Sequence, residues 1–259
     1  MTTRQRAPRM RATLRRVKAG GERFLGGVLP GATARRLHMR AFADEWAASN
    51  IDARHADGPL WVALGDSTGL GLGATTREAG YVGVAHELLR RRDAWRVVNL
   101  SQSGTGVADV LARQLPALVA LTDSRPAALV SCIVGTQDVA RRTPGLDTAL
   151  RSMLVALPPG AIVATIPLRD RVADALNGVI REEAARHGLR VVELGAVRGA
   201  PGRGRDGIRL NDVGHAAWAA AFVATVDNPA PNNEETPPDG IPTVPAHPGE
   251  NEPAAVVEQ

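Results

Sequence analysis

The first residues that could do chemistry form the polar tripeptide Gly65-Asp66-Ser67, directly after the apolar run Trp61–Leu64. A serine at the end of a buried strand can present its hydroxyl and its backbone N–H to one cleft, as nucleophilic catalysis requires. The glycine spacing from Gly69 to Ala74 also matches a dinucleotide-binding fingerprint, which needs a helix to begin on the glycines. Here the stretch Thr75–Gly80 intervenes before helical periodicity begins. We therefore favour the nucleophile hypothesis and keep the dinucleotide hypothesis as the alternative.

Three further polar blocks follow the serine, and each has a fixed place in the alternation of apolar runs and helical segments. They are Ser101-Gln102-Ser103-Gly104, Gly135-Thr136-Gln137-Asp138 and the stretch from Asp206 to His215. In the order and spacing of these four blocks, the chain resembles the SGNH (GDSL-type) hydrolase family over about residues 58–226. The resemblance implies a Ser-His-Asp serine hydrolase that acts on a small-molecule ester or related acyl substrate without a cofactor.

The resemblance also implies a role for each residue that matches a family motif. Ser67 corresponds to the nucleophile, and Asp206 corresponds to the carboxylate of the triad. The backbone N–H groups of Ser67 and Gly104 correspond to two donors of the oxyanion hole. The third donor of the family is an Asn amide, and this chain has Gln137 in its place. Gln carries its amide one methylene further out, and a misplaced donor costs about 10²-fold or more in rate.

The catalytic base is missing from its family position. The family histidine stands three residues after the triad Asp, where this chain has Arg209, and a guanidinium stays protonated and cannot be a general base. Under one hypothesis His215, in a second Asp-x-x-His that begins at Asp212, is a substitute base. Under the other, which we favour, Asp212 caps the last helix and His215 is a packed structural residue. We therefore expect either an impaired or rewired ester hydrolase or a non-catalytic binding protein, a pseudoenzyme, on the same fold.

Five short apolar runs, separated by helical segments, must position these blocks. The predicted strands cover residues 61–64, 96–100, 128–134, 161–166 and 190–194, and helical periodicity is clear over 107–118, 172–183 and about 212–225. Strands that alternate with helices form a parallel sheet covered on both faces. We therefore predict an α/β fold with three α/β/α layers and a five-stranded parallel sheet, in agreement with the flavodoxin-like SGNH fold that the resemblance implies. In such sheets ligands bind beyond the carboxyl ends of the strands.

Charge is unevenly distributed along the 259 residues. Residues 1–40 carry eleven basic side chains and one acid, residues 227–259 carry seven acids and no base, and the middle is nearly neutral. We predict a basic N-terminal arm over 1–40, a lead-in segment over 41–57, a hydrolase-type domain over 58–226 and a disordered, acidic, proline-rich tail over 227–259. A neutral middle with few aromatic residues argues against nucleic-acid binding.

Targeting and metal signals are weak. No stretch approaches the roughly 18 consecutive apolar residues of a membrane-spanning helix. The apolar run Phe24–Leu29 is shorter than the roughly 7–15 residues of a signal peptide, so we expect a cytoplasmic protein, with secretion as the alternative. The arm is expected to be a solvated extension, and weak contact with anionic lipid is the alternative. The single Cys132 and the lack of ligand spacing among the histidines predict no disulfide and no metal site.

Overall fold

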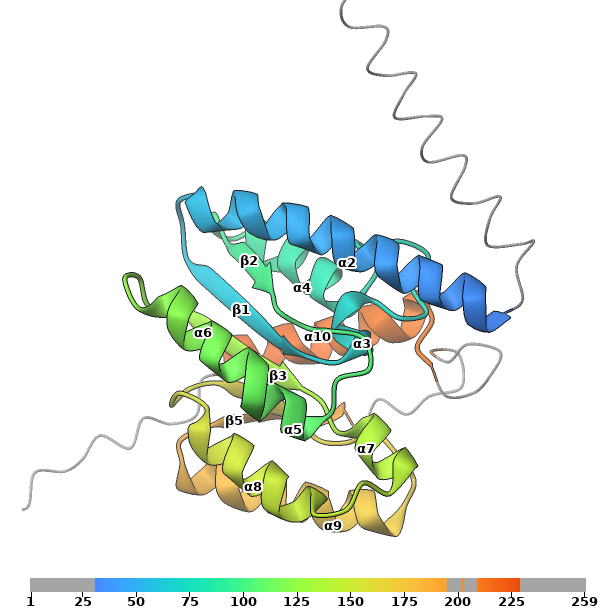
Figure 1. The fold of residues 1–259 in the computed structure, drawn as a ribbon. Coiled ribbons are helices and arrows are strands. Elements are labelled where there is room, and N and C mark those ends of the chain that lie inside the picture. Colours follow the sequence, from blue (N-terminus) through green and yellow to red (C-terminus); the bar gives the residue numbers. More distant parts are fainter. Residues whose placement is uncertain (1–30, 195–201, 203–208, 229–259) are drawn as a thin grey trace, which may run out of the picture.

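The computed structural model describes residues 31–194, 202 and 209–228, and its centre is a five-stranded parallel sheet (Figure 1). The strands are β1 (Leu60–Gly65), β2 (Arg96–Asn99), β3 (Leu129–Ile133), β4 (Ile162–Ala164) and β5 (Arg190–Val192). Their order is β2-β1-β3-β4-β5, and each neighbouring pair is parallel. The structure confirms the predicted sheet, and every strand end lies within two residues of its expected position.

Helices cover both faces of the sheet (Figure 1). They are α2 (Gly31–His55), α3 (Ser67–Leu70), α4 (Tyr81–Arg90), α5 (Val107–Asp109), the π-helical turn η1 (Val110–Gln114), α6 (Leu115–Thr122), α7 (Thr136–Arg141), α8 (Leu146–Ala156), α9 (Arg171–Arg186) and α10 (Asp212–Asp227). Successive side chains of a strand point to opposite faces. Val62 and Leu64 accordingly pack with α6, α8 and α9, whereas Trp61 and Ala63 pack with α4 and α10. This arrangement is the predicted three-layer α/β/α fold.

The long helix α2 crosses the expected border between the arm and the lead-in segment and packs against the sheet. The Nε1–H of Trp46 donates to the carbonyl oxygen of Leu70 (3.3 Å). Asn50 makes two hydrogen bonds to the backbone of Asn99: its Nδ2 donates to the carbonyl oxygen (2.9 Å) and its Oδ1 accepts from the N–H (2.8 Å). Because β2 is an edge strand, these bonds satisfy backbone groups that would otherwise face solvent. Most of residues 1–40 and all but the first two residues of the expected tail lie outside the described residues.

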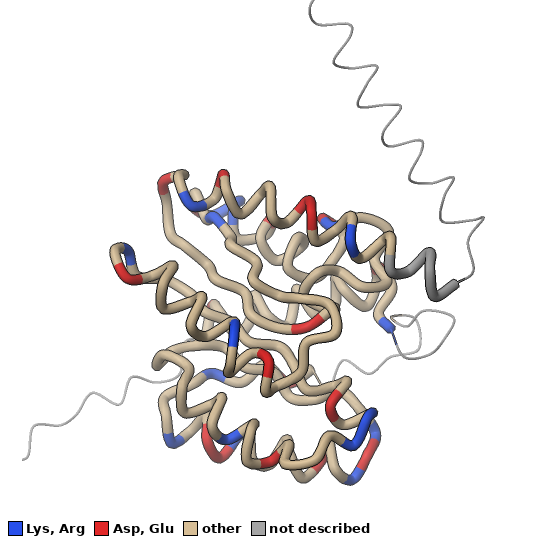
Figure 2. Tube along the Cα trace, viewed as in Figure 1, with Lys and Arg blue, Asp and Glu red and all other residues tan. Residues whose placement is uncertain are grey.

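Charged side chains lie mainly on the helices and turns, and the strands are almost free of them (Figure 2). The two exceptions are Arg96 and Arg190, each the first residue of its strand. None of the described helices is long and apolar enough to cross a membrane.

Candidate active site

Ser67 lies at the carboxyl end of β1, where the chain turns directly into α3. Asp66 caps this short helix, and its Oδ1 accepts from the Thr68 N–H (2.7 Å). Because Ser67 is the first residue of the helix, its N–H has no acceptor within the helix. The residue is only 3% exposed. Burial raises the pKa of the Asp66 carboxyl to about 6, and nearby Asp138 acts in the same direction, while hydrogen bonds from Thr68 oppose the shift. A helix therefore does begin in this loop, but it begins at the serine itself.

A buried glutamine holds the backbone just before the serine. The Gln114 Oε1 accepts from the Gly65 N–H (2.8 Å), and the Gln114 Nε2 donates to the Gly65 carbonyl oxygen (2.8 Å). Gly65 has a φ of +150°, and a Cβ there would lie 2.4 Å from the Ile133 carbonyl oxygen. Only glycine fits such a position. The chain that leads into Ser67 is thus fixed by one side chain and by the neighbouring strand.

Gln114 owes its place to a local change in helix geometry. The sequence predicts one continuous helix over 107–118, but the structure contains the π-helical turn η1 in which the Leu115 N–H donates to the Val110 carbonyl oxygen. Pro116 follows directly and has no N–H for the next helical bond, which accounts for the irregular ladder. Such π-bulges occur frequently at functional sites. Sequence reasoning missed Gln114, and Pro116 was the one local signal that could have drawn attention to it.

The loop after β2 packs directly against α3. The Asn99 Nδ2 donates to the Gly69 carbonyl oxygen (2.9 Å), and the Asn99 Oδ1 accepts from the Ser101 N–H (3.0 Å). A Cβ on Gly69 would lie 2.2 Å from the Ser101 Oγ, so this contact requires glycine. Further along the loop, Gly104 has a φ of +83°, and among the described residues no atom lies within 4 Å of a Cβ built there. Gly104 is therefore on the open side of this loop.

Gln137 meets Ser67 from the carboxyl end of β3. Its Nε2 donates to the Ser67 Oγ at 3.4 Å, while its buried Oε1 has no hydrogen-bond partner among the described residues. The neighbouring Asp138 is buried, and its Oδ2 accepts from the Val107 N–H (3.1 Å), which ties α7 to the start of α5. The structure therefore brings together two of the residues selected from the sequence, Ser67 and Gln137.

Arg209 lies beside the loop that follows α3. A Cβ on Gly73 would lie 3.5 Å from the Arg209 Cβ and 2.0 Å from the Leu210 carbonyl oxygen, so the two segments are in close contact. Residue 209 is thus adjacent to a loop that begins only a few residues after Ser67. Asp206, the expected triad carboxylate, lies outside the described residues.

His215 is completely buried, and both of its ring nitrogens bind backbone groups. The Nδ1 accepts from the Tyr81 N–H (3.1 Å), so the ring hydrogen is on Nε2, which donates to the Leu72 carbonyl oxygen (3.2 Å). Burial lowers the pKa of the imidazole, and this favours the neutral form. The ring joins α10 to the start of α4 and to the loop after α3, and neither nitrogen is left to accept a proton from a serine.

The last helix, α10, begins at Asp212 as expected, but its N-cap differs from the predicted one. Asn211, not Asp212, is its N-cap, and the Asn211 Oδ1 accepts from the Gly214 N–H (3.0 Å). Asp212 instead accepts hydrogen bonds from the N–H and the hydroxyl of Thr75 (2.8 and 2.7 Å). The prediction that Asp212 caps the helix is therefore wrong. Through Thr75, the Asp212 carboxylate binds the loop that follows α3.

The described residues contain no cluster of three or more His, Cys, Asp or Glu side chains that could hold a metal ion. Cys132 is buried in β3, in agreement with its apolar surroundings in the sequence. Burial raises the pKa of its thiol to about 12, so it is not a reactive thiolate.

Comparisons with known proteins agree with this fold. A model of the GDSL-like lipase/acylhydrolase family matches residues 63–217. Among solved structures, TesA is similar with 27% identity and a TM-score of 0.56, over 64% of this chain and 97% of that chain. The psychrotrophic esterase EstA from Pseudoalteromonas sp. is similar in fold (17% identity, TM-score 0.53, 66% of this chain and 97% of that one). So is the family 3 carbohydrate esterase of Clostridium thermocellum (16%, 0.53, 65% and 96%). No curated protein sequence matches the chain.

Proposed function

The chain belongs to the GDSL-like lipase/acylhydrolase family, and from this premise we propose that it hydrolyses carboxylic esters or related acyl groups through Ser67. The observation that carries the proposal is the 3.4 Å contact between the Gln137 Nε2 and the Ser67 Oγ. This contact joins a buried serine at a helix N-terminus to an amide donor that follows the neighbouring strand β3. Both lie at the carboxyl edge of a parallel sheet, where such folds bind ligands.

In the proposed reaction the Ser67 Oγ attacks the acyl carbon and the carbonyl oxygen becomes an oxyanion. The donors available to this oxyanion are the N–H groups of Ser67 and Gly104 and the side-chain amide of Gln137. Collapse of the tetrahedral intermediate breaks the bond to the alcohol and leaves an acyl group on Ser67. Water then attacks the acyl carbon, and the carboxylic acid leaves as the serine is regenerated.

The proposed reaction is slow because Ser67 lacks an imidazole partner among the described residues. Arg209 stands at the family histidine position, and both nitrogens of His215 are bonded to backbone groups. We therefore assign His215 a structural role and propose that the serine proton passes to solvent. General-base catalysis raises the rate about 10²–10⁴-fold, and the wild-type protein lacks this acceleration.

A second candidate function is a non-catalytic protein that binds an acyl group at the same site. The two backbone bonds of His215 favour it, because they exclude the one described histidine that the sequence offered as a substitute base. In that case Ser67 and Gln137 would bind the carbonyl group without forming a covalent bond.

Hydrolysis of short p-nitrophenyl esters distinguishes the two functions. We expect slow release of nitrophenol that Ser67→Ala abolishes. Ser152→Ala is the control, because Ser152 is an exposed serine on α8 and its loss should leave the activity unchanged. An activity that survives Ser67→Ala would contradict the hydrolase proposal, and saturable ester binding without turnover would favour the second candidate.

A further inference from the structure

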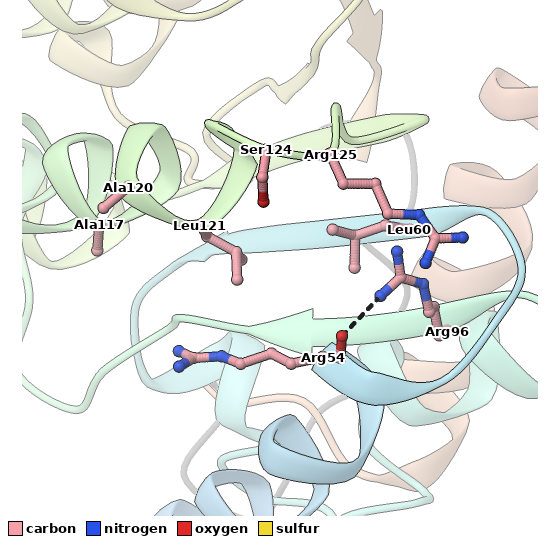
Figure 3. Close-up of a pocket in the computed structure, with 8 residues that line it drawn as sticks. All are labelled: Arg54, Leu60, Arg96, Ala117, Ala120, Leu121, Ser124 and Arg125. Carbon is pink, nitrogen blue, oxygen red and sulfur yellow. Dashed lines mark hydrogen bonds between the residues drawn. The ribbon is translucent and has the colours of Figure 1, made fainter.

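A pocket lies at the amino edge of the sheet, opposite the candidate active site (Figure 3). Its volume is about 480 Å³, within the range of small-molecule sites. Three arginines line it, Arg54 from the end of α2, Arg96 from the start of β2 and Arg125 from the segment after α6. The apolar side chains of Leu60 and Leu121 complete the wall. Leu60 is the first residue of β1, and Ser67 lies just beyond the other end of this strand. The full length of β1 therefore separates this pocket from the candidate active site.

Two of these arginines share one backbone acceptor. The Arg96 Nε donates to the Gly58 carbonyl oxygen (3.0 Å), and the Arg125 Nη2 donates to the same oxygen (3.3 Å). Their remaining contacts are also carbonyl oxygens, near the C-terminus of α2: Ala53 (2.8 Å) and Arg54 (3.5 Å) for Arg96, and Ala56 for Arg125 (3.4 Å). Figure 3 shows the two guanidinium groups next to each other.

The positive charge in this pocket is not matched by acidic side chains. Within the described part of the chain, no carboxylate oxygen lies within 4.0 Å of the guanidinium nitrogens of Arg54, Arg96 or Arg125. Arg96 is only 5% exposed, and charged side chains so deeply buried are normally paired. The C-terminus of α2 offers about half a negative charge, against two guanidinium groups. Burial and the neighbouring Arg125 lower the pKa of Arg96, and Asp57 compensates for only part of this effect.

We propose that this pocket binds an organic anion. Its carboxylate or phosphate group pairs with Arg96 and Arg125, since a guanidinium offers a fixed fork of donors to such oxygens. A short apolar part of the ligand contacts Leu60 and Leu121. The Arg54 guanidinium extends away from the other two along the pocket and places a further positive charge at its other end (Figure 3).

The required carboxylate has two sources, a small molecule in solution or the acidic C-terminal segment of this chain. Helix α10 ends at Asp227, whose carboxylate pairs with Arg92 in the turn just before β2. Ala94 in the same turn contacts Gly58, which accepts from both pocket arginines. The segment that follows α10 therefore starts near the pocket, and residues 229–259 carry six acids and no base.

Isothermal titration calorimetry with hexanoate and with inorganic phosphate tests the proposal on the full chain. We expect saturable binding that Arg125→Gln weakens about tenfold or more, the effect of losing one charge-assisted contact. Arg54→Gln should weaken it less, because the Arg54 guanidinium lies further from the bound anionic group. Arg54 is the safer variant, because its side chain makes no hydrogen bond or ion pair among the described residues. Arg113→Gln is the matched control: it removes an exposed charge on η1 that pairs with Asp109, and binding should not change.

A second full-length variant, with the six acids of 229–259 changed to their amides, identifies the source. Equal binding by this variant and the wild type supports a free ligand. Binding that appears only in the variant, and that Arg125→Gln again weakens, supports occupation by the chain's own acidic segment. If neither protein binds hexanoate or phosphate, or if binding survives both arginine substitutions, the proposal is wrong.

Discussion

Replacing Arg209 with histidine should restore the missing base. The proposed function places residue 209 at the family histidine position, and its Cβ lies beside the loop that follows α3. A general base contributes about 10²–10⁴-fold, or about 3–5 kcal/mol of transition-state stabilisation. Arg209→His should therefore raise kcat/KM for p-nitrophenyl acetate by about 10²-fold or more.

A second substitution adds to this gain. The Gln137 Nε2 donates to the Ser67 Oγ (3.4 Å), whereas an oxyanion donor must lie about 2.7–3.1 Å from the position that the substrate oxyanion will occupy. Gln137→Asn withdraws the amide by one methylene, as in the family motif, so we expect the double variant to exceed Arg209→His alone by about tenfold.

The assay is initial-rate hydrolysis between about pH 5 and 9, where an imidazole base adds a titration step near pH 6.5 that the wild type lacks. Ser67→Ala in the double variant is the control and should remove the whole gain. A folded Arg209→His protein with no gain, or a wild type whose activity depends on His215, would refute this alignment of the last block.

Three further predictions concern the residues that support the site. His215→Ala should lower the free energy of unfolding by about 2–4 kcal/mol in a urea titration, because it opens a cavity and leaves two backbone groups unpaired, while the activity per folded molecule stays the same; a selective loss of activity would make His215 the base. Gln114→Leu should cost about 1–3 kcal/mol by releasing the Gly65 backbone, and should lower kcat about tenfold with little change in KM, because it shifts the chain before the nucleophile; an unchanged kcat would show that the clamp does not position Ser67. The pKa of Asp66 is about 6 in the folded protein and 3.8 in the unfolded chain, so the folded state holds the proton more tightly. The protonated carboxyl therefore stabilises the fold below about pH 4, and about 3 kcal/mol of this stability is lost as the pH rises to about 6. Asp66→Asn should flatten the curve of unfolding free energy against pH in that window, and an unchanged curve would contradict the buried, proton-retaining carboxyl.

The sheet and the serine–glutamine contact could be predicted because both follow from local patterns. Each strand is a short apolar run between helical segments, and parallel strands bring their carboxyl ends to one edge. Ser67 and Gln137 each follow such a run, so the fold places them together although 70 positions separate them.

The remaining features depend on contacts that leave no local pattern. Gln114 binds the backbone of a residue 49 positions away, and backbone acceptors have no sequence signature. The sequence predicts Asp212 as the helix cap because its bonds to Thr75, 137 positions earlier in the chain, leave no local pattern. The pocket arginines come from three different elements, so their proximity becomes visible only in the folded chain.

The most direct test of Ser67 as a nucleophile is to treat the folded protein with a fluorophosphonate and map the product by mass spectrometry. Attack by the Ser67 Oγ on phosphorus expels fluoride and leaves a stable phosphonyl ester. We predict a single adduct on the peptide that contains Ser67, formed slowly in the wild type, faster in Arg209→His and at the wild-type rate in Ser152→Ala. No adduct in either the wild type or Arg209→His, or an adduct on another residue, would contradict a nucleophilic Ser67.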